Sequence, residues 1–588
     1  MKRFNLYILS FGFIITAITS VNAQFFLKAD GKKIVNEKGE NVLLRGVGLG
    51  GWMLQEGYML KLNKDGQQYR IRQRIEALLS KEQTQEFYDV WLSHHTTRAD
   101  INALKSWGFN SVRLPMHYNL YTLPVEQEKT VGENTWLAKG FELTDSLLAW
   151  CKANNMYLIL DLHAAPGGQG NDLNISDRDP SKPSLWESEA NQQKTIALWR
   201  KLAERYASEP NIAAYDILNE PNWGFSDLEH DKNGLKEQKN EPLKKIMVEI
   251  TKAIREVDKK HIIVIEGNGW GNNYNGILGD GLWDNNIVLS FHKYWNFNDD
   301  QSIAHILKYR DQYNIPVWLG ETGENSNVWF TQAIRLFEKN NIGWSWWPLK
   351  KLGYNNPLQV RSNLNYDALV DYWNGKASKP PKESNVYSGL LEFATYTKFE
   401  SNIIHRDVID AMIRQPFDYT AKPFKENKIA PGTTLYAVDY DLGANGIAYY
   451  DKDTANYRIS TEGNNVGNRG DGYRNDGVDI YKDNSHYNRW YVGHTEEGEW
   501  LQYTINIKAK TTYTLQLSYA GKEDGELSIT DGNASIAKAI KLSATGDETG
   551  WKTVDVKSIA FTPGVHHLRV LINKGGFNFS SIRFLKTE

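Results

Sequence analysis

The sequence contains almost no cysteine and shows no strong imbalance of charge. Cys151 is the only cysteine among 588 residues, which excludes intramolecular disulfides and a structural zinc site built from several cysteines. The formal net charge of −3 gives no reason to expect nucleic acid or an anionic surface as a partner. Beyond the N-terminus, no apolar run is long enough to span a membrane. The length exceeds what a single core supports, so we expect two or more domains.

Aromatic residues, in contrast, are abundant. The chain has 20 Trp and 31 Tyr. Many of these rings belong in hydrophobic cores, but flat amphipathic rings are also the surfaces on which sugars stack. The composition therefore favours a carbohydrate ligand.

The N-terminus has the pattern of a secretory signal. Lys2 and Arg3 precede an apolar stretch, which ends in Val21-Asn22-Ala23. This pattern predicts that residues 1–23 are a signal peptide cleaved after Ala23. We therefore expect a secreted protein, whether extracellular, at the cell surface or periplasmic.

Residues 24–415 alternate short β-branched runs with amphipathic stretches of helical period. Alternation of this kind implies a parallel sheet covered on both faces. Eight runs in about 350 residues favour a (β/α)₈ TIM barrel, and the lack of a G-x-G-x-x-G after the first run argues against a dinucleotide-binding fold. The runs are Val42–Val47, Ser111–Met116, Met156–His163, Ala213–Pro221, His261–Trp270, Ile287–Tyr294, Val317–Gly323 and Ile342–Leu349.

In such a barrel the carboxyl ends of the strands share one mouth. Glu220 lies at the end of the fourth run and Glu321 lies in the seventh, so the two carboxyls face each other across that mouth. Either glutamate alone could cap a helix or pair with an arginine. Together they form the pair that a double-displacement glycosidase needs, one to protonate the leaving oxygen and one to attack the anomeric carbon.

Other strand ends supply groups suited to the same chemistry. Arg113 and Tyr294 are expected to stabilise an ionised Glu321, and Asn219 to bind the sugar 2-hydroxyl. Two histidines are expected to bind hydroxyls or to orient the carboxylates, and one tryptophan to form a stacking floor for a sugar ring. These three residues are His163, His292 and Trp347.

The motifs RGVGLGGW, SVRLPMHY, DLHAAPGGQ, DILNEP, SFHKY, GETG and GWSWW extend over nearly the whole barrel. Together they resemble glycoside hydrolase family 5, and GGWMLQE and DLHAAPGGQ resemble its exo-β-1,3-glucanase branch. The resemblance implies a retaining mechanism with Glu220 as acid/base and Glu321 as nucleophile. It also implies that Glu56 grips a terminal sugar and that Asp172 acts similarly.

After the barrel the pattern changes. Residues 416–432 are rich in Pro and Lys and are expected to be a linker. Residues 433–588 show short alternating runs without helices, which predicts an antiparallel β-sandwich of jelly-roll type. GIAYYDKD, YRNDGVDI, GEWLQYTI and GGFNFSSIRF resemble carbohydrate-binding module family 6, which implies Tyr473 and Asn578 as ligand residues. The acidic residues that hold calcium in that family are absent from LYAVDYD, so a structural calcium is doubtful.

The sequence thus predicts a secreted retaining β-glucanase or β-glucosidase with a carbohydrate-binding module. We expect a monomer that acts on β-glucan polysaccharide or oligosaccharide, with no cofactor, no metal, no nucleic acid and no membrane span. An endo-β-1,4-glucanase or a mannanase is the alternative within enzymes. A catalytically silent glycan-binding protein is the alternative from another class. A metal-dependent barrel hydrolase would need a motif such as H-x-H on the first strand, which is missing.

Overall fold

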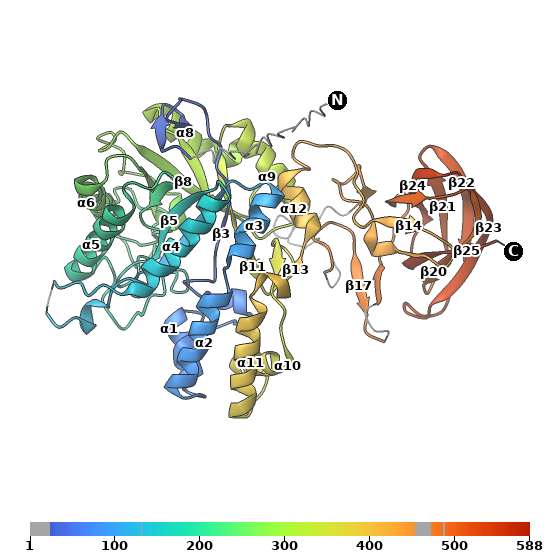
Figure 1. Ribbon diagram of the computed structural model, residues 1–588, viewed down its shortest axis with the longest axis horizontal. Helices are drawn as coiled ribbons and strands as arrows, with labels where there is room; N and C mark the ends of the chain where they lie inside the picture. The colour runs from blue at the N-terminus through green and yellow to red at the C-terminus, as the bar shows by residue number, and fades with distance from the viewer. Residues whose placement is uncertain (1–23, 131, 453–471, 486–488, 588) are drawn as a thin grey trace, which may run out of the picture.

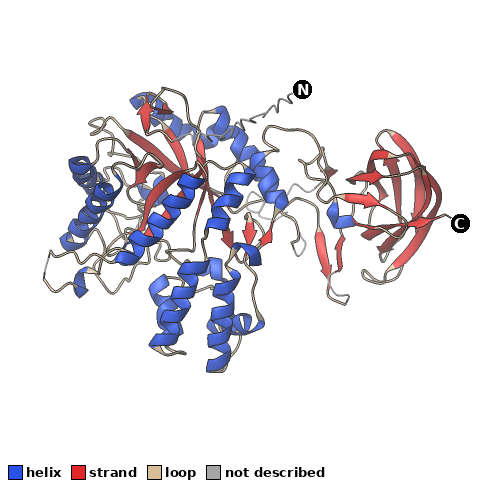
Figure 2. Cartoon of the chain, in the orientation of Figure 1, coloured by secondary structure: helices blue, strands red, loops and turns tan. Residues whose placement is uncertain are grey.

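The computed structural model describes residues 24–130, 132–452, 472–485 and 489–587. The expected signal peptide lies outside these ranges. The chain forms a mixed helix and strand part followed by an all-strand part, and the two lie side by side along the long axis of the molecule (Figure 1, Figure 2).

The first part is built on a closed barrel of eight parallel strands, in the order β10-β3-β4-β5-β6-β7-β8-β9. The (β/α)₈ barrel expected from the sequence is therefore confirmed. Its strands form from the β-branched runs because those residues are buried on both faces, inside the barrel and beneath the helices. They are β3 Arg45–Gly48, β4 Ser111–His117, β5 Tyr157–Ala164, β6 Ile212–Asp216, β7 Ile262–Glu266, β8 Ile287–Lys293, β9 Val317–Gly323 and β10 Gly343–Trp347.

Amphipathic helices surround the barrel and bury their apolar faces against it. The surrounding helices are α3 Arg98–Trp107, α4 Ala138–Ala153, α5 Glu189–Tyr206, α6 Glu241–Val257, α8 Ala304–Tyr313, α9 Asn327–Lys339 and α12 Arg406–Ile413; α7 Asn268–Gly271 is a single irregular turn.

The two ends of the barrel differ. A hairpin of β1 Leu27–Asp30 and β2 Lys33–Asn36 packs Leu27 and Ile34 against the apolar residues at the amino end of the strands. That end is therefore closed by hydrophobic packing, and the functional groups are left to the carboxyl end.

Four further helices form a group that projects from the barrel (Figure 1). Helix α2 packs against α11, and α11 packs against α10. Tyr366 and Phe393 stack at 3.9 Å within this group. Its helices are α1 Gln68–Glu76, α2 Lys81–His94, α10 Leu364–Trp373 and α11 Glu383–Tyr396; a small sheet of β11 Lys350–Lys351, β12 Leu358–Gln359 and β13 Ile403–Ile404 lies between this group and the barrel.

The C-terminal part has two sheets whose inner faces share one apolar core. Its all-β character agrees with the expectation, and the strands pair antiparallel except that β14 runs parallel to β19. One sheet has the order β14-β19-β24-β21-β22, with β16 beside β19; the other has β17-β18-β25-β20-β23, with β15 beside β25. The strands are β14 Asn427–Ile429, β15 Thr434–Tyr436, β16 Tyr449–Tyr450, β17 Ile480–Asp483, β18 Arg489–Val492, β19 Trp500–Ile507, β20 Thr511–Ala520, β21 Gly525–Asp531, β22 Ala534–Leu542, β23 Lys552–Phe561, β24 Gly564–Lys574 and β25 Asn578–Lys586.

Strand β14 lies inside the segment expected to be a linker, residues 416–432. The boundary at residue 433 therefore stays a proposal. Within the described ranges, no helix combines the length and the apolar character needed to cross a bilayer.

Candidate active site

A cleft of about 720 Å³ opens at the carboxyl end of the barrel. Eight of the residues singled out in the sequence line it, and they come from strands and loops far apart in the chain. They are Glu56, His163, Asp172, Glu220, His292, Tyr294, Glu321 and Trp347. Arg113 and Asn219, also singled out, are fully buried directly behind them.

Glu220 and Glu321 meet in this cleft. One oxygen of each carboxyl and one ring nitrogen of His292 all lie within 4.8 Å of one another. Carboxyl groups about 5–5.5 Å apart are typical of retaining glycosidases, whereas inverting enzymes need about 6.5–9.5 Å to admit a water. The separation fits the retaining geometry.

Glu321 is held by two donors. Arg113 Nη1 donates to its Oε1 at 2.5 Å, and the Tyr294 hydroxyl donates to its Oε2 at 2.9 Å. Both contacts stabilise a negative charge on the carboxylate, because hydrogen bonds to an ionised acceptor are roughly twice as strong as neutral ones. The arrangement is suited to an ionised nucleophile.

Glu220 is in a different electrostatic environment. Burial raises its pKa to about 7, although His292 opposes the shift by its charge and by a 2.6 Å hydrogen bond between its Nδ1 and Glu220 Oε1. The negative charges of Glu321 and Glu266 add to the increase. A carboxyl with a raised pKa of this kind can hold a proton near neutral pH, which is what general acid catalysis requires.

His292 is the cation that faces both glutamates. Burial lowers its pKa, but the negative charges of Glu266, Glu321 and Glu220 outweigh this effect and raise the pKa well above its usual value. Its Nε2 lies 3.2 Å from Glu266 Oε1, an ion-pair distance without hydrogen-bond geometry. Its Nδ1 lies 2.6 Å from Glu220 Oε1 and 3.7 Å from Glu321 Oε2, so a charged His292 can orient both carboxyls.

Glu266, at the end of β7, was not singled out in the sequence. Its Oε2 accepts the backbone N–H of Glu220 at 2.7 Å, and its Oε1 accepts from Arg113 Nη2 at 3.2 Å. The sequence does contain a signal for Glu266. It ends the apolar stretch HIIVIE, and a carboxylate at the end of a barrel strand lies at the barrel mouth, as Glu220 and Glu321 do.

The floor of the site is a fully buried ion cluster centred on Arg113. Burial raises the pKa of Asp161 and of Asp216 well above its usual value, despite the attraction of Arg113. The guanidinium lies within 3.2 Å of carboxylate oxygens of Asp161, Asp216, Glu266 and Glu321.

One wall of the cleft is aromatic. The rings of Trp347 and His163 stack at 5.1 Å with an 8° angle between their planes, and Trp347 Nε1 donates to the Tyr58 hydroxyl at 2.9 Å. Burial lowers the pKa of His163 to about 3, so this ring is neutral. The Asn219 side chain is fixed by Arg113 Nη2, which donates to its Oδ1 at 2.8 Å.

Glu56 and Asp172 also line the cleft. Burial raises the pKa of Glu56 well above its usual value, and the negative charges of neighbouring carboxylates add to the increase. Burial also raises the pKa of Asp172, opposed by a hydrogen bond from Trp270. Whether either side chain contacts a sugar stays a prediction.

Comparison with known proteins agrees with this geometry. Residues 65–353 match the family model described as Cellulase (glycosyl hydrolase family 5). Endoglucanase C of Acetivibrio thermocellus is 31% identical over 337 residues, which cover 56% of this chain and 82% of that protein. The chain belongs to glycosyl hydrolase family 5.

Other relatives of this family 5 glycoside hydrolase have different names. A protein named Beta-xylosidase from Phanerodontia chrysosporium is 27% identical over 384 residues, which cover 58% of this chain and 75% of that protein. A probable glucan 1,3-beta-glucosidase A of Aspergillus clavatus is 27% identical over 186 residues, which cover 31% of this chain and 42% of that protein.

The C-terminal part of the family 5 enzyme matches a carbohydrate-binding module, but of another family than expected. Residues 474–583 match Carbohydrate binding module (family 35), so the expectation of family 6 is corrected. The motifs used for that expectation supply the buried strand residues Tyr449, Leu501, Phe579 and Phe584. These residues form the core of the sandwich, which related module families share. The families differ in their surface residues.

The two module residues singled out lie in different surroundings. Tyr473 is half-buried, and its hydroxyl donates to Asp439 Oδ1 at 2.5 Å and accepts from Lys425 Nζ at 2.9 Å. Asn578 Nδ2 donates to the backbone oxygen of Glu548 at 2.7 Å. Their role in glycan binding stays a prediction.

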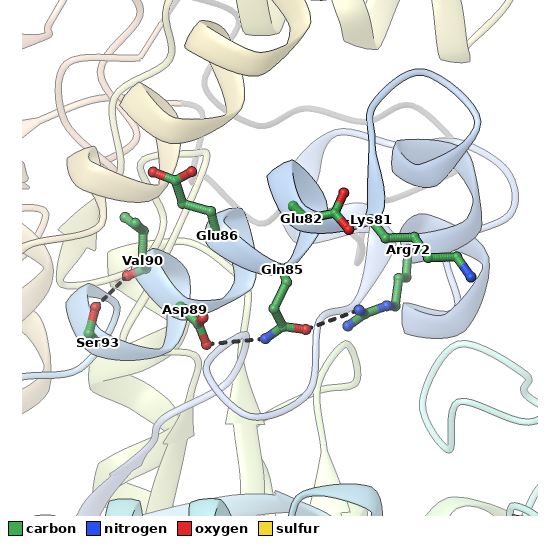
Figure 3. A pocket seen from close by; sticks show the side chains of 8 residues that line it. All are labelled: Arg72, Lys81, Glu82, Gln85, Glu86, Asp89, Val90 and Ser93. Atoms are coloured by element: carbon green, nitrogen blue, oxygen red, sulfur yellow. Dashed lines mark hydrogen bonds between the residues drawn. The ribbon is translucent and has the colours of Figure 1, made fainter.

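A second hollow lies on the surface of α1 and α2, away from the catalytic groups (Figure 3). Three of its polar side chains are linked by hydrogen bonds. Gln85 accepts from Arg72 and donates to Asp89, each at 3.1 Å, as Figure 3 shows. We find no grouping of catalytic type among its lining residues, and the barrel mouth is the candidate active site.

Proposed function

We propose that the enzyme is a retaining β-glycosidase acting on β-glucan, with Glu220 as acid/base and Glu321 as nucleophile. The observation that carries the proposal is the pair itself. Two carboxyls approach within 4.8 Å, one anchored by Arg113 and Tyr294 and one with a pKa of about 7.

In the first step Glu321 attacks the anomeric carbon while Glu220 transfers its proton to the leaving glycosidic oxygen. The bond to the aglycone breaks and an ester forms between the sugar and Glu321. Arg113 and Tyr294 remain as donors to the carboxyl group as its charge is consumed. The Asn219 amide, fixed by Arg113, is suited to bind the sugar 2-hydroxyl as positive charge develops at the ring.

In the second step Glu220, now ionised, removes a proton from water, which attacks the anomeric carbon and releases Glu321. Loss of the Glu321 charge in the ester removes one contribution that raises the pKa of Glu220. The pKa of Glu220 is therefore lower between the two steps than before the first, which suits its change from general acid to general base.

Support for a glucan substrate comes from the aromatic wall and the module. Trp347 presents an indole to the cleft, and such faces stack on pyranose rings. A carbohydrate-binding module on the same chain suits a polymer or its fragments. The names Endoglucanase C and glucan 1,3-beta-glucosidase A belong to relatives that act on glucans, and we carry this substrate class to the present enzyme as a proposal.

Exo action on β-1,3-glucan is our first choice, and Glu56, a buried carboxyl in the cleft wall, is the residue suited to grip a terminal sugar. Endo action on β-1,4-glucan is the second candidate, because Endoglucanase C is 31% identical over most of its length. Product analysis on laminarin, mixed-linkage glucan, cellulose and mannan separates these: glucose alone as first product supports exo action, and a ladder of oligosaccharides supports endo action.

We also propose that the enzyme is exported by residues 1–23 and acts as a monomer outside the cell. The apolar stretch and the small residues before position 24 support export.

The function is tested by chemical rescue. Glu321→Gly should lose hydrolysis of an aryl β-glucoside, and added azide should restore turnover to give the α-glucosyl azide, because azide fills the space left by the carboxylate. The wild-type enzyme with azide is the control. No rescue with an activated donor, or retained hydrolysis by the variant, would contradict Glu321 as nucleophile; a folded wild-type protein that binds glucan without turnover would support the silent binding protein.

A further inference from the structure

A short segment of the module, residues 472–476, is bonded to the loop that follows the nucleophile strand. That loop, residues 324–326, joins β9 to α9. Asn475 Nδ2 donates to the backbone oxygen of Asn325 at 2.8 Å. The backbone N–H of Asn327 donates to the Asn475 oxygen at 3.0 Å.

The bond to the backbone oxygen of Asn475 gives a partner to the backbone N–H of Asn327, which has none within its own helix. Asn327 is the first residue of α9, and the first backbone N–H groups of a helix have no intrahelical partner. Here the partner is a carbonyl of the module. The module therefore completes the amino end of a barrel helix.

Helix α12 contributes to the same junction. Asp407 Oδ2 accepts from Asn327 Nδ2 at 2.8 Å and from the backbone N–H of Asn475 at 2.7 Å. Asp476 Oδ1 accepts from Asn327 Nδ2 at 2.9 Å. Asn325, Asn327, Asp407, Asn475 and Asp476 are all at most 2% exposed. A buried network with this many hydrogen bonds indicates a rigid contact between the module and the barrel rather than a transient one.

The segment is as firmly held on the module side. Arg474 Nε donates to Asp476 Oδ2 at 2.8 Å, and the same guanidinium donates to the backbone oxygens of Tyr440 and Asp441. The guanidinium also lies over the Tyr440 ring, 3.7 Å from its centroid. Movement of the module would therefore be transmitted to residues 475 and 476.

The loop held in this way belongs to the catalytic cleft. Glu324 lines the cleft three residues after Glu321, and its carboxylate is paired with Lys351. Glu324 has a φ of 51°, a left-handed conformation that a non-glycine residue adopts only where its surroundings impose it. A second module contact reaches the neighbouring loop, where a Cβ on Gly472 would lie 3.0 Å from the Tyr354 ring.

We propose that the module is a structural part of the active site: residues 472–476 hold the β9–α9 loop and, through it, Glu324 and the end of the nucleophile strand. In this view the module has two separable effects. One is to keep the enzyme near polymer. The other is to position the cleft wall, and it acts on every substrate, including a small soluble glycoside for which polymer binding is irrelevant.

The test compares two asparagines of the module in the full chain. Asn475→Ala removes the bonds that Asn475 Nδ2 donates to the backbone oxygen of Asn325 and to Asn327 Oδ1. Asn573→Ala is the matched control, because Asn573 Nδ2 donates within the module, to Glu526 and Ser528. On a soluble aryl β-glucoside we expect kcat/KM to fall about tenfold for Asn475→Ala, since small displacements of catalytic groups cost rate steeply. The control should keep wild-type kinetics.

Hydrogen exchange gives a readout that does not depend on activity. In the wild-type protein the amides of Asn327 and Asn475 should be protected to the same extent, because they open together. In Asn475→Ala, exchange in residues 324–327 should accelerate while exchange in β19 and β24 is unchanged. Equal kinetics for a folded Asn475→Ala and its control, or rapid exchange at Asn327 in the wild type, would overturn the proposal.

The kinetic arm rests on the proposed β-glycosidase activity, but the exchange arm does not. If the wild-type enzyme fails to hydrolyse aryl β-glucosides, the proposed function is contradicted and the exchange data still decide whether the module holds the loop. If Asn475→Ala does not fold, the wild-type exchange at Asn327 and Asn475 decides it alone.

Discussion

The carboxylate of Glu266 accepts the backbone N–H of Glu220 at 2.7 Å. Glu220 has a φ of 41°, in the left-handed region that costs a non-glycine residue of the order of 1 kcal/mol. The bond to Glu266 holds the Glu220 backbone in that conformation, and the Glu220 side chain therefore points into the cleft. A residue that need not touch substrate thus fixes the direction of the proposed acid/base.

Glu266→Gln tests this role. The substitution keeps the shape but removes the charge that the Glu220 N–H, Arg113 and His292 share. We expect kcat to fall about 100-fold with a smaller change in KM, because the substitution disturbs the orientation of Glu220 and leaves the surface that binds substrate unchanged. Glu338→Gln, which breaks an ion pair with Arg45 at 2.7 Å, is the matched control and should retain activity. Equal kcat for Glu266→Gln and the wild type would remove Glu266 from the positioning role.

The pH profile tests Glu220. Its raised pKa means that the folded protein holds the proton up to about pH 7, so kcat/KM should fall as pH rises through about 7. The same shift gives a stability contribution that is complete below the ordinary value of 4.5 and is lost as pH rises through about 7. In Glu220→Gln the basic limb should vanish, and residual activity should depend strongly on the leaving group. A basic limb unchanged in this variant would assign it to another residue.

His292→Ala should move that limb in a defined direction. His292 lowers the pKa of Glu220 by its charge and by its hydrogen bond. Without it, the pKa of Glu220 rises, and the basic limb of kcat/KM should shift to higher pH while the maximal rate falls. A shift to lower pH would contradict the arrangement of charges described here.

Arg113→Lys tests the buried cluster. A lysine cannot reach four carboxylates in a planar fork, and breaking a buried ion pair costs about 3–5 kcal/mol. We expect a loss of about 3 kcal/mol in the free energy of unfolding, measured by urea denaturation, together with a large fall in kcat. Arg45→Lys, at the half-exposed pair with Glu338, should cost less than about 1 kcal/mol. A stable, active Arg113→Lys would show that the guanidinium is not needed at the floor of the site.

The barrel could be predicted from the sequence because its strands are continuous apolar runs that end in polar residues. That pattern follows directly from burial on both faces and a shared mouth, and it predicts that Glu220 and Glu321 lie in one site. Glu266 follows the same rule at the end of β7, yet its importance lies in a bond to a backbone N–H that no residue pattern reports.

Other features could not be predicted because they depend on contacts between distant segments. Helices α1 and α2 are stabilised by α10 and α11, some 300 residues later, and neither pair shows the strand and helix alternation of the barrel. Within residues 472–476 the sequence motifs predict a role for Tyr473, whereas Asn475 is the residue that bonds to the barrel. The module family was misjudged because core residues, not surface residues, supplied the motifs.

The stereochemistry of hydrolysis tests the central claim most directly. Proton NMR of the anomeric region, recorded within the first minutes after the wild-type enzyme meets an aryl β-glucoside, shows which anomer forms before mutarotation. If Glu321 and Glu220 act by double displacement, β-glucose appears first and the α-anomer grows in later. First appearance of α-glucose would show inversion, remove Glu321 as nucleophile and contradict the account.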